Sequence, residues 1–379
     1  MKKLLLLTIL FVLIISSGIS NPLYLNIKIF SGEFLDSVTV TPLVDGYNLI
    51  MDDSAKIEMS SNTKYLFVIS NNKVKMQSGG IVFGFFKTLA IKNKDVACTF
   101  LITNSLIPDR IYDNNLFIHS RGEYLEIINN VELENYVAGV VKAEVAGATD
   151  LEKIFEIQAI ISRTYALNNI MKHYKDGYNL CDAVHCQVYR GHCNNVKIYN
   201  ATNYTKDKVI IDKQGKMISA AFHSNSGGQT INSEDIWSIS TSYLKSVKDN
   251  YSIQMPNYKW VAKVPVKEWL SYLEEKYEFP VYDSLMVYRA LNFTQETRTV
   301  YFINNIPLKY IRADLKLKST FFSITTHNGM VYINGKGYGH GVGLSQEGAI
   351  RMIQLGFIPE EVIQFYYTDV SITDYSSLN

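Results

Sequence analysis

Residues 137–167 read VAGVVKAEVAGATDLEKIFEIQAIISRTYAL, and this stretch decides the fold of its region. Apolar residues recur at spacings of three and four from Leu151 to Ile161, which predicts a helix with one face in a hydrophobic core. Thr149 and Glu152 form the T-x-x-E pattern of a capping box ahead of this apolar run. We therefore expect the helix to begin at this box.

A second face of the predicted helix carries Gln158, Ser162, Tyr165 and Asn169 at the same spacings. All four are uncharged hydrogen-bonding groups, whereas a helix face in solvent usually carries Lys and Glu. The stripe is compatible with a solvated face or with the wall of a sugar-binding groove. Arg163 lies between the two faces and is expected to anchor a carboxylate, either internal or from a ligand.

Glu144 is a lone carboxylate in a run of Val, Ala and Gly just before this helix. Apolar surroundings raise the pKa of a carboxyl group, and a protonated carboxyl near neutral pH can act as a general acid. The alternative is an exposed acid with no catalytic role. Glu134 lies nearby, where a peripheral acid at a helix start would be, and ordinary glycosidases need two carboxylates. A single acid suffices if the substrate supplies its own nucleophile.

The composition limits the class of partner. The chain has 379 residues, 47% of them hydrophobic, with 37 basic and 36 acidic side chains. This length suggests two or three domains with a large core. Without a basic excess we expect no nucleic-acid partner and no attraction to an anionic membrane surface. A neutral, carbohydrate-like partner fits this balance better.

The first twenty residues have the pattern of an export signal. Lys2 and Lys3 precede an apolar run from Leu4 to Ile15, and small residues follow up to Ser20. The run is shorter than the roughly twenty residues that span a bilayer, so we expect a cleaved signal peptide over residues 1–20. The alternative is a retained N-terminal anchor, the one case in which the protein would be attached to a membrane. Either way the remainder is expected outside the cytoplasm, in the periplasm, in the cell wall or secreted.

The remaining chain is expected to be an α+β protein. Residues 21–117 hold β-branched and aromatic runs such as LNIKIF and KYLFVIS between turn-forming clusters, which predicts a β-rich accessory region. Residues 118–379 hold the candidate functional residues and are expected to form the catalytic domain. Within them, residues 255–325 are expected to be a peripheral α+β portion, with VKEWLSYLEEKY as an amphipathic helix.

A cluster of thiols and imidazoles follows the predicted helix, in CDAVHCQVYRGHC at residues 181–193. Thiolate and imidazole groups suit Zn²⁺, which takes four ligands in a structural site. Cys181, His185 and Cys186 are the candidate ligands, with His173 or His192 as the fourth. A disulfide among the cysteines and free thiols remain alternatives. No cofactor is expected to be required for the chemistry, so the zinc would be structural.

Two further segments are rich in groups that could contact a ligand. Residues 220–237 place Ser, Asn, Gly and Gln around His223, in a composition typical of loops that present polar groups. Near the C-terminus, GYGHGVGLSQEGAI at residues 337–350 predicts a glycine loop leading into a helix capped by Ser345. The glycines do not form G-x-G-x-x-G, and no P-loop Lys-Ser/Thr follows, so a nucleotide site is excluded. His340 and Gln346 favour a functional role for the loop.

These blocks resemble, in order, the SpoIID/LytB family. The resemblance covers roughly residues 118–367 and rests on VELENYVAGVVKAEV, LEKIFEIQAIISRTYALNN, CDAVHCQVYRG, AAFHSNSGGQT with SEDIW, YLKSVKDNYS and GYGHGVGLSQEGAI. It implies a SpoIID-type catalytic domain in a bacterial cell-wall protein that acts on the glycan strands of peptidoglycan. It also implies lytic transglycosylase activity on peptide-stripped strands, which cleaves the MurNAc–GlcNAc bond and leaves 1,6-anhydro ends.

The family's catalytic acid falls on Glu144 of this sequence. We expect a larger set to position the glycan, namely Gln158, Arg163, Tyr165, Ser224, Ser226, Gln229, Tyr338, His340, Ser345 and Gln346. Some relatives bind zinc through the Cys/His segment, which favours the metal site. The resemblance also allows a second role, as a non-catalytic glycan-binding enhancer of a cell-wall amidase.

The sequence departs from the family pattern at two positions. Members usually read EMP from the catalytic acid, whereas here Val145 and Ala146 follow Glu144, so the proline is missing. The glycine loop usually carries a Trp where this chain has Tyr338, which can still stack on a sugar face. The first change is expected to affect how Glu144 is presented.

Overall fold

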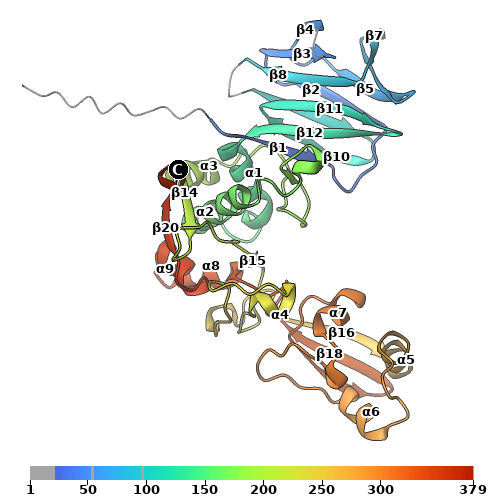
Figure 1. The fold of residues 1–379 in the computed structure, drawn as a ribbon, viewed down its shortest axis with the longest axis vertical. Helices are drawn as coiled ribbons and strands as arrows, with labels where there is room; N and C mark the ends of the chain where they lie inside the picture. The colour runs from blue at the N-terminus through green and yellow to red at the C-terminus, as the bar shows by residue number, and fades with distance from the viewer. Residues whose placement is uncertain (1–21, 53–54, 95–97, 379) are drawn as a thin grey trace, which may run out of the picture.

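The computed structural model describes residues 22–52, 55–94 and 98–378, so the predicted signal segment lies outside the described residues. The N-terminal part of the chain forms two sheets that pack face to face (Figure 1). Their strands pair antiparallel, except that the short β13 pairs parallel with β1. In the described residues the larger sheet has the order β13 (Leu180–Cys181), β1 (Tyr24–Ile29), β12 (Tyr124–Glu132), β11 (Asn115–Arg121), β8 (Thr88–Asn93), β3 (Tyr47–Met51), β4 (Ala55–Met59). The smaller sheet has the order β10 (Ile107–Asp113), β9 (Thr99–Asn104), β2 (Ser37–Pro42), β5 (Tyr65–Ser70), β6 (Lys73–Ser78), β7 (Ile81–Phe86).

Alternating side chains explain why the two sheets pack together. Leu25, Ile27 and Ile29 of β1 are buried while their neighbours are partly exposed, the period of two that a half-buried strand requires. The same core receives Phe67 of β5 and Phe100 of β9. The strand-like sequence of this region therefore forms the predicted β-rich structure, which continues past residue 117 into β11 and β12.

The edge of the larger sheet leads directly into the candidate site. β1 pairs with β12 on one side and with the two-residue strand β13 on the other, where Lys28 lies opposite Cys181. β12 runs without a turn into α1 (Leu133–Val145), at whose C-terminal end Glu144 lies. The sheet thus fixes both Glu144 and the first candidate metal ligand.

α2 (Glu152–Asn168) packs beside α1 and α3 (Val196–Tyr204). The predicted stripe is confirmed, since Ile154, Ile157 and Ile161 are buried in a second core. The predicted capping box is wrong: the N-cap is Leu151, and the Thr149 hydroxyl accepts a hydrogen bond from the Leu151 amide instead. The Thr149 side chain stabilises the turn before the helix, not the helix start itself.

The C-terminal elements return to α2. β14 (Lys208–Ile211) pairs with β20 (Ser371–Asp374), and α9 (Pro359–Tyr366) packs against α2. Two further short strands, β15 (Phe222–His223) and β19 (Leu344–Ser345), pair in parallel. This pair brings His223 beside the end of the glycine loop: Phe222 pairs with Leu344 and His223 with Ser345, each 122 residues further along the chain.

Residues 259–336 form a separate layered unit with its own core. β16 (Lys259–Pro265) pairs with β18 (Met330–Lys336), which pairs with β17 (Phe322–His327). α5 (Val266–Tyr277) coincides with the predicted amphipathic helix and buries Trp269 and Leu273 against this sheet. The unit lies at the opposite end of the molecule from the N-terminal sheets (Figure 1).

The remaining helices are short. They are α4 (Ser233–Trp237), α6 (Ser284–Leu291), α7 (Leu308–Asp314), α8 (Gln346–Gln354) and the 3₁₀ turns Tyr174–Asp176, Asn250–Ser252, Ile303–Asn305 and Tyr375–Leu378. Within the described ranges, no helix combines the length and apolar character needed to cross a bilayer.

Candidate functional site

A cavity of about 760 Å³ lies where four distant parts of the chain meet. The end of α1 and residues 184–188 form one wall, and residues 219–224 with the glycine loop form the other. Among the described residues that line it, Glu144 is the only carboxylate. The cavity has the size of a small-ligand site and mixes aromatic rings with a few polar groups.

Glu144 occupies the last turn of α1 and is half-buried. Burial raises the pKa of its carboxyl, which a hydrogen bond of 2.9 Å from the Val188 amide and the charge of Arg190 partly oppose. The negative end of the helix dipole at this position also disfavours a carboxylate. The direction of the pKa shift that the apolar sequence predicted is therefore confirmed.

The missing proline leaves the backbone beside Glu144 in a compatible conformation. Ala146 is the C-cap of α1, and its φ is −62°, within the range that a proline ring imposes. Val145 before it remains helical and buried. A proline at position 146 would disfavour helical backbone at Val145, so its absence lets α1 continue through Val145.

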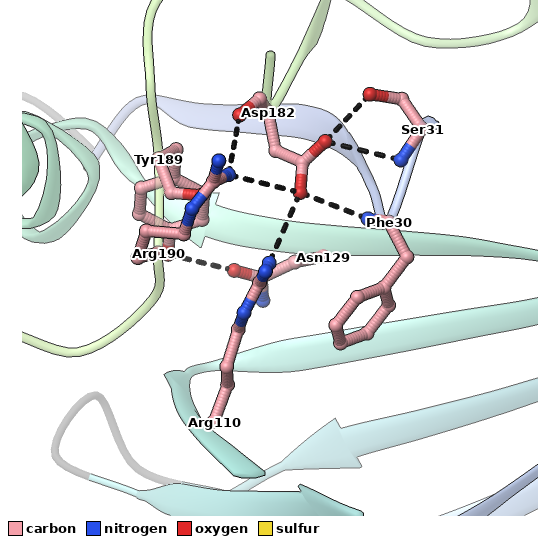
Figure 2. A network of polar contacts seen from close by, with 7 residues as sticks. All are labelled: Phe30, Ser31, Arg110, Asn129, Asp182, Tyr189 and Arg190. Atoms are coloured by element: carbon pink, nitrogen blue, oxygen red, sulfur yellow. Dashed lines mark hydrogen bonds and ion pairs between the residues drawn. The ribbon is translucent and has the colours of Figure 1, made fainter. Parts of the chain in front are cut away.

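The Asp182 carboxylate anchors the wall that carries Val188 (Figure 2). It accepts hydrogen bonds from the amides of Phe30 and Ser31 at 2.9 and 3.1 Å, and pairs with Arg110 at 3.3 Å. Arg190 donates to the Asp182 carbonyl at 2.8 Å and lies 3.6 Å from its carboxylate. Residues 182–190 are therefore tied at both ends to the N-terminal sheets.

The metal-binding prediction falls on the same wall. The donor atoms of His173, Cys181, His185 and Cys186 all lie within 4.8 Å of one another. Cys186 Sγ is 3.6 Å from His173 Nε2, and Cys181 Sγ is 3.8 Å from His185 Nδ1. Tetrahedral zinc separates its N and S ligands by roughly 3.3 to 3.8 Å, given bonds of about 2.0 to 2.3 Å. Two thiols and two imidazoles in this arrangement fit a structural zinc site.

Of the two candidates for the fourth ligand, the structure brings His173 to the cluster. His192 instead pairs with Asp113 at 2.8 Å, which raises the pKa of His192. Cys193 is a buried free thiol whose sulfur lies 3.7 Å from the Asn195 carbonyl. Cys181 and Cys186 are also free thiols. A hydrogen bond from Cys186 lowers the pKa of Cys181, which favours a thiolate.

The opposite wall presents two neutral histidines. The Val342 amide donates to His340 Nδ1 at 3.0 Å, so the proton of that ring is on Nε2. The Val342 carbonyl lies 3.1 Å from His223 Nδ1, which must therefore donate. Burial lowers the pKa of His340 to about 4 and that of His223 well below its usual value. His223 Nε2 is then a buried acceptor, and in the described residues it has no partner.

Gly339 allows this wall to close. Its φ is +115°, a conformation that L side chains rarely adopt, and an added Cβ would lie 2.7 Å from His223 Cβ. Trp237 packs on His340 with ring centroids 5.0 Å apart. Trp237 and Tyr338 each remain more than two-fifths exposed, so both can offer a ring face to a sugar.

Six of the predicted catalytic and glycan-binding residues line the cavity, namely Glu144, Tyr165, Ser224, Tyr338, His340 and Gln346, and the candidate metal ligands His185 and Cys186 line it too. Gln158 lies behind the wall: Gln346 Nε2 donates to its Oε1 at 3.3 Å, and it donates in turn to Ser162. The polar stripe of α2 thus supports one cavity residue through Gln158 and contributes another through Tyr165.

Four predicted residues have structural partners and do not line the cavity. Arg163 is fully buried and donates to both carboxylate oxygens of Glu134, so its anchor is internal and Glu134 is not peripheral. Ser226 donates to Asp249 at 2.7 Å. Gln229 bonds to Ser246 and to the Arg298 amide, and Ser345 caps α8 as predicted.

Asn169, which was predicted to lie in the polar stripe, lines the cavity, as do Lys172, Trp237 and Arg312, which were not predicted to contact a ligand. Trp237 belongs to the SEDIW block and Asn169 to the polar stripe, so both had a local signal. Arg312 comes from α7 in the peripheral unit, and nothing near it in the sequence indicates a site.

Comparison with known proteins gives consistent matches. The family described as Stage II sporulation protein matches residues 121–211. Stage II sporulation protein D of Bacillus amyloliquefaciens is 31% identical over 268 residues, covering 66% of this chain and 76% of that protein. The Bacillus subtilis protein of the same name is 30% identical, covering 65% and 76%. The amidase enhancer of Bacillus subtilis is 26% identical, covering 62% of this chain and 40% of that protein.

Proposed function

The chain belongs to the SpoIID/LytB family, and from this premise we propose that it is a lytic transglycosylase of peptidoglycan. Its substrate is proposed to be the peptide-stripped glycan strand, cleaved between MurNAc and GlcNAc. The observation that carries the proposal is that Glu144 is the only carboxylate among the described residues lining the cavity. A hydrolase with two carboxylates would need a second acid there.

One carboxyl group can carry out both proton transfers of a lytic reaction. Protonated Glu144 gives its proton to the glycosidic oxygen as the bond from that oxygen to C1 of MurNAc breaks. The resulting carboxylate then takes the proton from the C6 hydroxyl of the same sugar, whose oxygen forms a new bond to C1. The products are a 1,6-anhydro end and a free 4-hydroxyl, and Glu144 is protonated again. Water is not consumed.

The surrounding residues are proposed to hold the strand. Trp237 and Tyr338 can stack on sugar faces. His223 Nε2 can accept a hydrogen bond from a sugar hydroxyl or amide, since it is buried with no partner in the described residues. Gln346, held by Gln158, offers a further polar contact.

Zinc is proposed at His173, Cys181, His185 and Cys186 as a structural ion. When bound, it would link the strand β13 to the segment that leads to Val188, whose amide contacts Glu144. With four protein ligands it would have no open position for substrate.

Export to the cell envelope, through residues 1–20, is proposed from the sequence.

The test is digestion of purified, peptide-stripped glycan by wild-type protein and by Glu144→Gln, with mass spectrometry of the products. We expect anhydro-ended fragments with the wild type and a loss of about 10²- to 10⁴-fold in Glu144→Gln. Glu123→Gln, at an exposed position, is the matched control and should cleave normally. Products with free reducing ends, or equal cleavage by Glu144→Gln, would contradict the proposal.

The similarity to an amidase enhancer supports a second candidate, a glycan-binding protein that stimulates a cell-wall amidase. The same digestion separates the two. Glycan binding without any product, together with faster release of stem peptides when an amidase is added, would favour the enhancer.

A further inference from the structure

We propose that Arg312 is a specificity-determining residue that binds a carboxylate on the saccharide in the cavity. Under the proposed function, on which this inference rests, the group is the lactyl carboxylate of muramic acid. That carboxylate is free when the peptide has been removed and is an amide when the peptide is attached. Arg312 would thereby distinguish stripped strands from peptide-bearing ones.

The guanidinium of Arg312 is without a partner. It makes no hydrogen bond or ion pair with any described residue, and its Nε is buried. Burial lowers the pKa of Arg312, as expected for a cation with no carboxylate beside it. Arg312 is half-buried, and a charge that is partly removed from water without a partner is costly, so such groups are normally paired.

Two arginines that are more deeply buried than Arg312 show how this chain usually satisfies the group. Arg163 donates to both oxygens of Glu134. Arg298 donates to the carbonyls of Gln229 and Ser226 at 2.6 and 2.7 Å and to the Thr320 hydroxyl at 3.2 Å. Arg312 differs from both because it lines the cavity and its guanidinium has no acceptor among the described residues, which indicates that a ligand supplies one.

The charges around the cavity favour a carboxylate as that ligand group. The second cation that lines it, Lys172, already donates to the His185 carbonyl at 2.6 Å and to the Tyr165 hydroxyl at 3.2 Å. The positive charge of Arg312 helps to lower the pKa values of His340 and His223. The positive charge that lowers the pKa of Glu144 is that of Arg190. Arg312 therefore belongs to the histidine wall, away from the catalytic acid. A planar guanidinium matches the two oxygens of a carboxylate.

The inference gives the peripheral unit a role in the site. Arg312 lies on α7, and Lys309 of the same helix donates to the Ile236 carbonyl in α4 at 3.1 Å. This contact holds α7 next to α4, the helix that ends at Trp237 (Figure 1). Both Trp237 and Arg312 line the cavity. The unit formed by residues 259–336 thus contributes one charged side chain to a cavity otherwise built by the rest of the chain.

The test measures binding, so that it does not depend on turnover. Glu144→Gln protein is titrated with peptide-stripped glycan oligomers and with the same oligomers after their lactyl carboxylates are coupled to methylamine. We expect the free acid to bind about 10- to 100-fold more tightly, as for a lost charge-assisted hydrogen bond. Adding Arg312→Gln should abolish this preference and leave the affinity for the methylamide nearly unchanged. Arg312→Lys should retain part of this preference, because lysine keeps the positive charge but cannot donate two parallel hydrogen bonds to one carboxylate.

Arg289→Gln, at an exposed position on α6 of the same unit, is the matched control and should keep the full preference. Equal affinity of the Glu144→Gln protein for both glycans overturns the inference without any substitution at Arg312. An equal loss of affinity for both glycans in Arg312→Gln also overturns it. Wild-type cleavage of the stripped glycan, measured in parallel, shows whether the proposed function stands or falls independently.

Discussion

The two walls of the cavity are built in opposite ways. On the wall that carries Glu144, the loop is tied down: the Asp182 carboxylate accepts from two amides and pairs with two arginines, and Val188 donates to the proposed catalytic acid. On the wall that carries the histidines, His223 Nε2 and Arg312 Nε lack partners in the described residues. On the first wall the amide nitrogen of Gln187 also lacks one, although its amide oxygen accepts from the Tyr136 hydroxyl.

This difference separates two tasks of a saccharide-cleaving site. A general acid must be held within hydrogen-bond reach of one oxygen, so its wall benefits from rigid internal bonds. A wall that recognises substrate must keep donors and acceptors available, and unpartnered polar groups lower the stability of the free protein. We therefore expect substitutions in the first wall to lower the stability of the protein, and substitutions in the second wall to weaken glycan binding.

Removing the metal ligands should break the first wall most severely. We expect wild-type protein to contain about one zinc per chain and Cys181→Ser to contain none, with a loss of more than about 3 kcal/mol in the free energy of unfolding. Metal analysis and denaturant unfolding measure both effects. Cys193→Ser, a buried thiol outside the cluster, should retain its zinc. Full zinc content in Cys181→Ser would contradict the site.

Asp182→Asn should weaken the same wall by a smaller amount. The substitution removes the charge that Arg110 and Arg190 share, and we expect the free energy of unfolding to fall by about 2 to 4 kcal/mol. Denaturant unfolding at constant pH measures it, with the exposed Asp109→Asn as control. A change below about 0.5 kcal/mol would show that the Asp182 network does not hold the loop.

Local patterns predicted one wall better than the other. The apolar run around Glu144 predicted its raised pKa, and the spacing of thiols and imidazoles predicted three of the four clustered candidate ligands. Both signals lie within a short stretch, where neighbours in sequence are neighbours in space. The sequence could not decide between His173 and His192, because that choice depends on contacts between distant segments. β1 positions Cys181 by pairing with β13, and Asp113 at the end of β10 pairs with His192 and keeps it from the cluster.

The second wall depends on packing between segments far apart in the chain. Arg312 reaches the cavity only because α7 docks on α4, and no local spacing reports that contact. Ser226 and Gln229 have the same residue types as Ser224, yet they point into buried networks. A polar loop sequence cannot distinguish a side chain that bonds to the protein from one that bonds to a ligand.

His223→Asn should affect the second wall in binding and not in stability. The amide of Asn can still donate to the Val342 carbonyl in place of Nδ1, but the free acceptor at Nε2 is lost. In the Glu144→Gln protein we expect about 5- to 10-fold weaker binding of stripped glycan and a stability change below about 1 kcal/mol. Titration calorimetry and thermal unfolding measure the two. The exposed His327→Asn should alter neither, and a large loss of stability at His223 would make it part of the scaffold.

The smallest expected effect concerns pH, to which the two walls respond differently. Glu144 must be protonated to donate, so kcat/KM falls as pH rises through its pKa, and burial places that fall above the usual range of a carboxyl. His340, whose pKa is lowered to about 4, stays neutral from pH 7 down to about 5 and should add no ascending limb there. Arg190→Gln removes the positive charge that lowers the pKa of Glu144, so the fall should move to higher pH, whereas Arg190→Lys should leave it in place. The measurement is a pH profile of glycan cleavage. Two results would assign the titrating group to the other wall. One is a fall that moves to lower pH in Arg190→Gln, and the other is an ascending limb near pH 6.5 that His340→Asn removes.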